Sequence, residues 1–344
     1  MVSLEKHFLE AWQRSSGWLY LLFPIAAIFY VLTLTRKTLL QNLYQGRRYK
    51  FPVVVVGNLN VGGSGKTPTV ISLANALKTK GLRPGVVSRG YGSSAHKYPV
   101  IVDKHTIYKE CGDEPLLIQR RCACPVVVDP DRPSAIKTLI NDFNCNVIIS
   151  DDGMQHYKMH RDVEIAVFNE HINLGSFLML PSGPLREPIT RLRDVDYIIS
   201  YGELREEIKS MLDPEKDNSI FNVEHRLLRL RNIDSGETIH PEDWKMSKNV
   251  HLVAGIAHPK KICATIEEFG FVATVKSIGD HKKITDSDAT FNDSLPILIT
   301  EKDAIKLDNL DKLDTNKIWI LETHVDLNSE FINSLLGKLK ISLN

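Results

Sequence analysis

The sequence predicts an α/β protein with a doubly wound parallel sheet, followed by a second, smaller α/β domain. The apolar run Phe51–Gly57 ends in glycine and leads directly into a glycine-rich loop. Further apolar runs then alternate with segments of helical periodicity, at intervals typical of a sheet covered by helices on both faces. The alternation is interrupted near residue 219 and restarts beyond it. We therefore place one domain at 38–218 and another at 219–344.

The composition excludes several classes of protein. The 344 residues are 43% hydrophobic and 25% charged, which suits a globular chain with more than one core. The net charge of +1 creates no general field for nucleic acid, so we expect no nucleic-acid partner. Five cysteines, an odd number at irregular spacing, fit a reducing compartment better than a disulfide framework. The oligomeric state is left open.

The N-terminal segment is strongly apolar. Gly17–Thr35 carries no charge and approaches the roughly 20 residues that a helix needs to cross a bilayer. Arg36 and Lys37 follow at once, which favours the cytoplasmic side and attracts anionic head groups. The alternative is a buried amphipathic helix of a soluble domain. We predict a membrane-associated helix within 1–37, and Pro24 leaves open whether it spans the bilayer or lies in one leaflet.

The elements of the first domain follow from periodicity. Phe51–Gly57 is uniformly apolar and largely β-branched, which is typical of a parallel strand buried on both faces. Lys66–Lys80 repeats apolar residues at helical spacing and stops at Gly81. The elements that continue the alternation are strands at Gly85–Ser88, Pro125–Val128, Asn146–Ser150, Glu164–Phe168 and Asp196–Ser200, and helices at Glu114–Arg121 and Ser134–Phe143.

The second domain begins with a predicted connecting ribbon. Ser219–Leu230 has strand character and leads into a polar turn at 234–236, so it could link the two domains as one strand of a β-ribbon. The β/α pattern then resumes at Val250–Ala254, Lys260–Phe269, Val272–Ile278, Ile297–Ile299 and Ile318–Leu321. Phe331–Leu339 suits a C-terminal helix.

The loop after the first strand predicts a nucleotide-phosphate site, and with it a P-loop NTPase-like sheet. It comprises Asn60, Val61, Gly62, Gly63, Ser64, Gly65, Lys66 and Thr67. Successive amides of such a turn, at a helix N-terminus, form an anion cradle. Lys66 would contact the β- and γ-phosphates of ATP, and Thr67 would ligate Mg²⁺. Asn60 stands where the general pattern has glycine, and asparagine tolerates the left-handed backbone that glycine adopts there.

A second apolar strand ends in two carboxylates, Asp151 and Asp152. Parallel strands present their carboxyl ends at one edge, and in P-loop proteins an Asp at this place holds Mg²⁺ directly or through water. The simpler alternative is a pair of turn residues, which are common after strands. We predict a metal role, and the spacing leaves open which of the two lies nearer the ion.

A series of sequence blocks resembles the tetraacyldisaccharide 4'-kinase family, the lipid A 4'-kinases of Gram-negative bacteria. The blocks are VVVVGNLNVGGSGKTP (53–68), SRGYG (88–92), GDEP (112–115), SDDGMQH (150–156), RDVEI (161–165), LPSGPLREP (180–188), GDH (279–281) and TEKDAIK (300–306). The resemblance implies two α/β/α domains joined by a two-stranded linker, with the active site in the cleft. It also implies Mg-ATP and a membrane-borne lipid disaccharide acceptor, phosphorylated on its 4'-hydroxyl at the cytoplasmic face of the inner membrane.

The resemblance also implies roles for individual residues. Asp113 resembles the general base that deprotonates or orients the acceptor hydroxyl, with Glu114 beside it, and His281 resembles the histidine that pairs with this base from the second domain. Domain closure would then complete the site. Further candidates are Arg89 and Arg132 for the nucleotide phosphates, Arg186 for the lipid's own phosphate, and Gln155 and His156 as residues that line the cleft.

A different class of protein also combines a glycine-rich phosphate loop with membrane attachment. This is the P-loop ATPase switch of the kind that positions cell-division sites or partitions plasmids. Those proteins carry lysine directly before the paired glycines, where this chain has Val61, and their membrane helix tends to be C-terminal. We therefore predict a lipid kinase, with the ATPase switch as the alternative.

Overall fold

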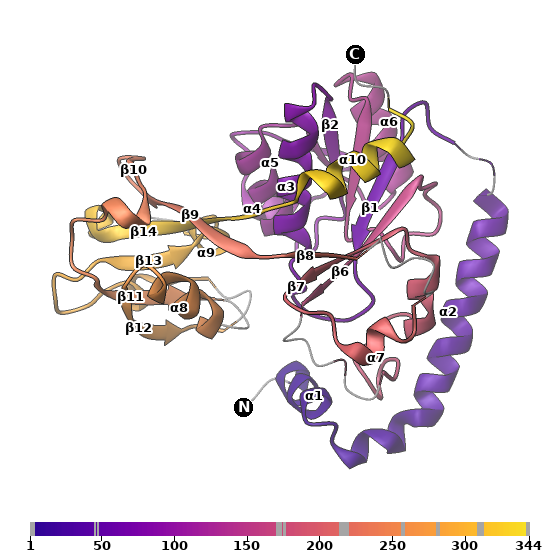
Figure 1. The fold of residues 1–344 in the computed structure, drawn as a ribbon, viewed down its shortest axis with the longest axis horizontal. Coiled ribbons are helices and arrows are strands. Elements are labelled where there is room, and N and C mark those ends of the chain that lie inside the picture. The colour runs from indigo at the N-terminus through magenta and orange to yellow at the C-terminus, as the bar shows by residue number, and fades with distance from the viewer. Residues whose placement is uncertain are drawn as a thin grey trace.

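The computed structural model describes residues 4–341, apart from 45, 47, 170–173, 175–176, 213–219, 256–258, 280–282 and 308–312. Two sheets form the body of the molecule, each covered by helices (Figure 1). The first has eight strands and the second has six. The α/β class and the division into a larger and a smaller sheet agree with the sequence prediction.

The first sheet has the strand order β3-β4-β2-β5-β1-β6-β7-β8. Its strands are β1 (Val53–Gly57), β2 (Pro84–Ser88), β3 (Val100–Val102), β4 (Val126–Val128), β5 (Val147–Asp151), β6 (Val163–Asn169), β7 (Tyr197–Tyr201) and β8 (Ile220–Val223). All neighbours pair in parallel except β3, which runs antiparallel to β4 at one edge. The central strands β2, β5 and β1 therefore end side by side, where ligands bind in open parallel sheets.

Helices cover both faces of the first sheet, because alternate residues of a strand point to opposite sides. Val54 and Val56 face a core shared with α3 (Lys66–Thr79) and α5 (Asp113–Cys122). Val53 and Val55 face a core shared with α6 (Arg132–Asn141) and the 3₁₀ helix η2 (Ile189–Asp194). The remaining short helices of this unit are α4 (Tyr108–Cys111) and α7 (Glu206–Lys209).

The second sheet has the order β10-β9-β14-β13-β11-β12. Its strands are β9 (His225–Asn232), β10 (Thr238–Ile239), β11 (Asn249–Ala254), β12 (Val272–Ser277), β13 (Ile297–Thr300) and β14 (Ile318–Val325). Its helices are α8 (Pro259–Glu267), α9 (Glu301–Ala304) and the 3₁₀ helices η4 (Pro241–Asp243), η5 (Asp286–Asp288) and η7 (Thr315–Lys317). Strand β9 is antiparallel to β14, whereas β11, β12, β13 and β14 pair in parallel.

The two sheets are joined by β9 and β14, the antiparallel pair that crosses between them (Figure 1). The sequence located the first of these strands and its polar turn, but gave no sign that β14 is its partner. The chain then returns to the first sheet, because helix α10 (Ser329–Lys338) buries Phe331 and Leu335 in the core of α3 and α5. The helix lies where it was predicted, but it packs with the first unit and not with the unit 219–344 to which the sequence division assigned it.

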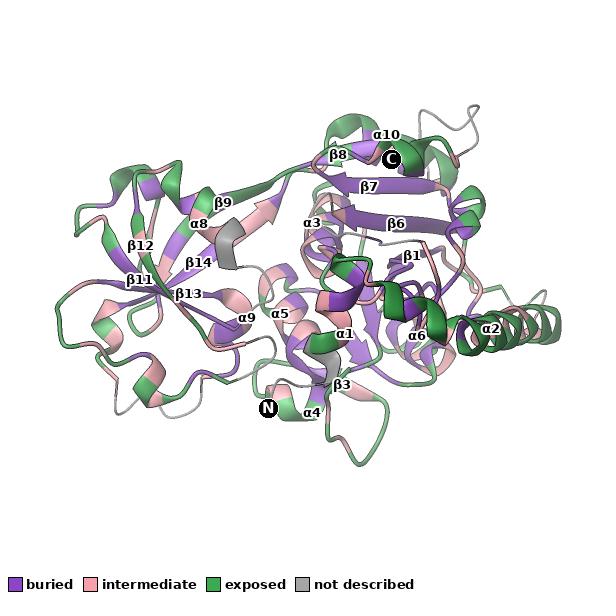
Figure 2. Ribbon diagram, turned by 90° about the horizontal axis from the view of Figure 1, so that it is seen from below, coloured by how far each residue is buried: buried purple, intermediate pink, exposed green. Residues whose placement is uncertain are grey.

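The N-terminal segment forms α1 (Leu4–Gln13), the 3₁₀ helix η1 (Gly17–Leu22) and α2 (Phe23–Tyr44), so the helix continues past the predicted end at residue 37. Within the described residues, Gly17–Tyr44 is the helical segment long and apolar enough to cross a membrane. It lies along the outside of the first unit with most of its surface exposed (Figures 1 and 2). This exposure argues against the alternative of a buried helix in a soluble core.

Candidate active site

The phosphate loop connects β1 to α3 and places Lys66 at the start of the helix. Lys66 Nζ donates to Asn58 Oδ1 at 3.2 Å and lies 3.6 Å from Asp152 Oδ1. Gly62 and Gly65 have φ values of 114° and 92°, which favour glycine. Asn60, in contrast, does not adopt the left-handed backbone expected for it. It is fully buried and forms an isolated antiparallel bridge with Leu185, so an extended residue suffices there.

A second segment, 179–186, covers the phosphate loop. The backbone N–H of Val61 donates to the carbonyl of Pro184 at 2.9 Å, and the N–H of Arg186 donates to the carbonyl of Leu59. The LPSGPLREP block therefore braces the strand that precedes the loop. The same brace brings the Arg186 guanidinium to 3.1 Å from Asp152 Oδ2. Arg186 thus lies at the nucleotide side of the site in this structure.

The two carboxylates after β5 differ in their surroundings. Asp152 pairs with Lys66 and Arg186, and these cations hold its pKa below the usual range against the effect of burial. Asp151 is buried, and Ser88 donates to its Oδ2 at 3.4 Å, but its Oδ1 has no hydrogen-bond partner. Burial, and then the negative charges of Glu114 and Asp152, raise the pKa of Asp151. A buried carboxylate oxygen without a donor is well suited to accept a cation.

The metal predicted at this place fits these residues. Within the described ranges, no three His, Cys, Asp or Glu side chains form a metal-binding cluster of their own. Mg²⁺ bound with a nucleotide needs only one or two carboxylates, because phosphate oxygens and water complete its coordination. Asp151 with its open oxygen, Asp152, and Thr67 at the second position of α3 provide a donor set of this kind.

Arg132, a predicted phosphate ligand, supports the end of β5 in this structure. Its side chain is buried, with NH1 donating to Ser150 Oγ at 2.7 Å and NH2 donating to the carbonyl of Asp152 at 3.0 Å. Burial lowers its pKa to about 10. The neighbouring charge of Arg89, which is exposed at the end of β2, acts in the same direction. Direct contact of either arginine with phosphate stays a prediction.

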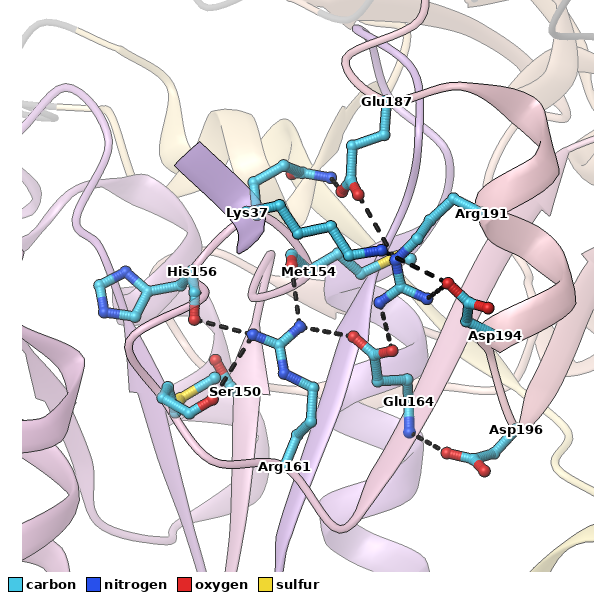
Figure 3. Close-up of polar contacts among 12 residues, drawn as sticks. Lys37, Ser150, Met154, His156, Arg161, Glu164, Glu187, Arg191, Asp194 and Asp196 are labelled. Atoms are coloured by element: carbon cyan, nitrogen blue, oxygen red, sulfur yellow. Dashed lines mark hydrogen bonds and ion pairs between the residues drawn. The ribbon is translucent and has the colours of Figure 1, made fainter. Parts of the chain in front are cut away.

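Figure 3 shows a buried network of ion pairs around Arg191, and Gln155 links the phosphate-loop strand to this network. Its Nε2 donates to the carbonyl of Asn58 at 3.1 Å and to Glu187 Oε1 at 2.8 Å. Glu187 Oε2 lies 3.4 Å from Arg191 Nε, and Arg191 also pairs with Glu164 and Asp194. Gln155 therefore holds the end of β1, and its predicted contact with substrate is untested.

His156 lies beside this network but is not paired through its ring. Its carbonyl accepts from Arg161 at 2.8 Å, and its Nε2 is buried without a hydrogen-bond partner. Burial, reinforced by the positive charges of Arg132 and Arg161, lowers the pKa of His156 to about 3. The ring is therefore neutral at physiological pH and does not act as a cation there.

Asp113 begins α5, and the second domain reaches it. A carboxylate in the first turn of a helix is stabilised by the N-terminal partial charge. Lys306 Nζ lies 3.0 Å from Asp113 Oδ2, and Lys302 Nζ lies 3.7 Å from the same oxygen and 3.5 Å from Glu114 Oε1. His281, the predicted partner of Asp113, lies outside the described residues. The contacts that the structure describes from the second domain come from two lysines that the sequence analysis did not single out, and the backbone N–H of Glu114 donates to Asp113 Oδ1 at 3.1 Å.

Sequence reasoning thus found the loop and the acidic strand end but missed several supporting residues. Asn58 and Glu187 lie inside blocks that were recognised as whole motifs, so attention to their polar side chains could have found them. Tyr201 gave no signal, because an aromatic residue at a strand end is common. Its hydroxyl nevertheless donates to the carbonyl of Gly65 and contacts Thr69 Oγ1, both at 2.9 Å, and its ring stacks on His225.

Comparison with known proteins shows which family the chain is similar to. A sequence profile of the tetraacyldisaccharide-1-P 4'-kinase family matches residues 18–340. Proteins named tetraacyldisaccharide 4'-kinase from Hahella chejuensis and from Ruthia magnifica are 37% and 40% identical to this chain. The first match covers 96% of this chain and 95% of that protein, and the second covers 93% and 97%.

A solved structure is also similar over nearly the whole chain. It is the crystal structure of the "apo" form of LpxK from Aquifex aeolicus in complex with ATP. The TM-score is 0.75 at 27% sequence identity, and the match covers 93% of this chain and 99% of that one.

Proposed function

The chain belongs to the tetraacyldisaccharide-1-P 4'-kinase family, and on this premise we propose how its residues carry out the reaction. The enzyme is a kinase that uses Mg-ATP to phosphorylate the 4'-hydroxyl of a tetraacyldisaccharide 1-phosphate. Because the chain belongs to this kinase family, the kinase function is favoured over the alternative, the ATPase switch. The observation that carries the proposed mechanism is the ion pair between Lys66, which begins α3 directly after the glycine-rich loop, and Asp152, which directly follows β5.

The nucleotide would bind with its phosphates on the amides of the phosphate loop. Lys66, now held by Asn58 and Asp152, has the reach to move onto the β- and γ-phosphates. Thr67, Asp151 and Asp152 would hold Mg²⁺, which neutralises charge on the phosphate oxygens when bound. Arg186, beside Asp152, would then help to hold the phosphates.

Asp113 would receive or orient the 4'-hydroxyl of the acceptor. A positioned carboxylate is sufficient for this step, because phosphoryl transfer depends mainly on alignment and charge stabilisation. Asp113 lies in the first turn of α5, where the partial positive charge of the helix N-terminus stabilises a carboxylate. Glu114 stands beside it and contributes to the field that raises the pKa of Asp151.

The reaction would take place at the cytoplasmic face of the inner membrane. An acceptor with four acyl chains stays in the bilayer, so the enzyme must work at the surface. The helical segment Gly17–Tyr44 exposes Leu21, Ile28 and Leu32, which suits lipid contact, and its apolar stretch is followed by Arg36 and Lys37. Lys37 pairs with Asp194 at 3.4 Å, so this basic end is also anchored on the first unit.

A lipid-kinase assay tests the proposal. Purified full-length protein in detergent, with Mg-ATP and tetraacyldisaccharide 1-phosphate, should yield the 1,4'-bisphosphate by mass spectrometry. Asp113→Ala should lower kcat by a large factor and keep ATP affinity, whereas Lys66→Ala should impair use of ATP. ATP hydrolysis with an unchanged lipid would overturn the kinase proposal and favour the ATPase switch, and wild-type turnover by Asp113→Ala would remove that residue from the base role.

A further inference from the structure

The block TEKDAIK at 300–306 has no role in the mechanism above, although it lies next to the proposed active site. It covers the last residue of β13, helix α9 and the turn that follows. Each polar residue of the block makes a specific contact. These contacts divide into two groups, one that holds α9 on the second sheet and one that joins α9 to α5 of the first unit.

The start of α9 is fixed by Thr300 and Asp303. Thr300 Oγ1 donates to Asp303 Oδ2 at 2.6 Å, and the backbone N–H of Asp303 donates back to Thr300 Oγ1 at 3.1 Å. The backbone N–H of Gly255 donates to the same Asp303 carboxylate at 3.1 Å. Asp303 is fully buried, so this arrangement sets the direction of α9 with little freedom.

Glu301 attaches the helix to the C-terminal end of α5. Its carboxylate pairs with Arg121, and the backbone N–H of Thr323 donates to Glu301 Oε2 at 3.3 Å. Arg121 NH2 in turn donates to the carbonyl of Thr323 at 3.1 Å. Helices α5 and α9 are therefore docked by a contact far along α5 from Asp113, which lies at the other end of that helix.

Lys302 and Lys306 extend from this docked segment to the beginning of α5. Residues four apart in a helical turn share a face, so both ammonium groups reach one place. Lys306 is only 5% exposed, and its Nζ lies 3.0 Å from Asp113 Oδ2. Burying an ammonium group without a compensating anion is costly, and the Asp113 carboxylate is the anion beside it. Lys306 Nζ pairs with the Asp113 carboxylate, whereas Lys302 Nζ lies near the carboxylates of both Asp113 and Glu114.

We propose that Lys306 is a positioning residue of the kinase reaction, acting through Asp113. The inference rests on the proposed function, in which Asp113 receives or orients the acceptor hydroxyl. Lys306 holds the Asp113 carboxylate in one orientation through this ion pair. Because Lys306 belongs to the second domain, Asp113 is held in this way only while α9 is seated on α5. The second domain thus takes part in catalysis by setting the geometry of a residue in the first.

The test compares three variants of the full-length enzyme in the lipid-kinase assay. Lys306→Met keeps the length of the side chain and removes its charge. We expect it to lower kcat on the order of 10- to 100-fold, the usual effect of a misplaced reacting group, with KM for ATP within about threefold of wild type. Lys306→Arg keeps the charge and should recover a large part of the lost kcat.

Glu301→Gln is the matched control, because it weakens the same docking contact without touching Asp113. If Lys306 acts only by docking the domains, Glu301→Gln and Lys306→Met will have equal effects on kcat and KM, and the proposal is wrong. It is also wrong if Lys306→Met keeps the wild-type kcat. Thermal melting checks each variant, and Lys306→Gln replaces Lys306→Met if the latter is not folded. An inactive wild-type enzyme would instead count against the proposed function itself.

Discussion

The ring of Tyr201, at the end of β7, lies directly against the α-carbon of Gly65 in the phosphate loop. A Cβ added at Gly65 would overlap the aromatic carbons of Tyr201, and the backbone of Gly65 has a φ of 92°. The Tyr201 hydroxyl also donates to the carbonyl of the same glycine. The phosphate loop is therefore shaped by contact with a neighbouring strand as well as by its own sequence.

We accordingly expect Gly65→Ala to damage the loop. The clash and the positive φ together should destabilise the fold by about 2 kcal/mol or more and raise KM for ATP. Urea denaturation and steady-state kinetics measure the two effects. The control is Gly337→Ala in α10, where an added Cβ meets nothing within 4 Å and stability should be equal or greater. Equal behaviour of the two variants would contradict this account of the loop.

Arg191 joins the buried carboxylates of Glu164 and Glu187, so its removal takes the paired cation from Glu187 and leaves Glu164 with Arg161 alone. Breaking a buried pair from one side costs about 3–5 kcal/mol, and we expect Arg191→Met to lower the free energy of unfolding by that amount. Lys209→Met removes the exposed pair with Glu206 and should cost about 0.5 kcal/mol or less. Chemical denaturation distinguishes them, and a small effect of Arg191→Met would show that the network is not essential for stability.

The buried carboxyl of Asp151 should give the stability of the metal-free protein an unusual pH dependence. Its pKa is higher in the folded chain than the ordinary 3.8, so its contribution to stability is complete below about pH 4 and is lost as the pH rises. Asp151→Asn should therefore stabilise the metal-free protein at pH 8, by about 1.4 kcal/mol for each unit of the shift, and have little effect at pH 4.

The same substitution should weaken the response to Mg-ATP. Thermal melting with and without Mg-ATP measures the response, which is expected to be large in wild type and small in Asp151→Asn. If Asp151→Asn destabilised the metal-free protein at pH 8, the carboxylate would be a structural group and not a poised metal ligand.

The exposed apolar side chains of η1 and α2 should control attachment to lipid. Replacing Leu21, Ile28 and Leu32 by serine removes side chains that each contribute roughly 1.5–3 kcal/mol when transferred from water to an apolar phase. We expect vesicle binding in a flotation assay to fall by at least about 10-fold per residue, with activity in detergent retained. Val272→Ser with Val275→Ser, at two exposed valines of β12, is a control of the same chemistry. Equal loss of binding by this control would remove α2 from the role.

The sequence predicted those parts of the fold that depend on local pattern. The strands before Asn60 and Asp151 could be located because buried parallel strands are continuous apolar runs, and the phosphate loop because its chemistry requires a fixed spacing. The membrane helix was recognised by the same local criterion, with its end misplaced because helical periodicity continues to Tyr44.

The remaining features depend on packing between distant segments. Helix α10 was recognised, but periodicity does not say which sheet an apolar face will cover. The backbone of Asn60 follows from its bridge to Leu185, a partner far away in sequence. The contact of Lys306 with Asp113 needs the relative placement of two domains, which no short motif specifies. These three features are determined by tertiary packing and not by local sequence.

Because residues 225–325 lie between two parts of the first unit's chain, the order of synthesis matters for folding. On the ribosome, the second sheet has all its strands before α10 emerges, whereas the core that receives Phe331 and Leu335 is still open. Domains generally fold as units during translation, so the phosphate-binding unit can close only after α10 has emerged. A chain that terminates early, after residue 325, would leave the apolar surface that α10 covers exposed, and we expect such a chain to be more susceptible to proteolysis.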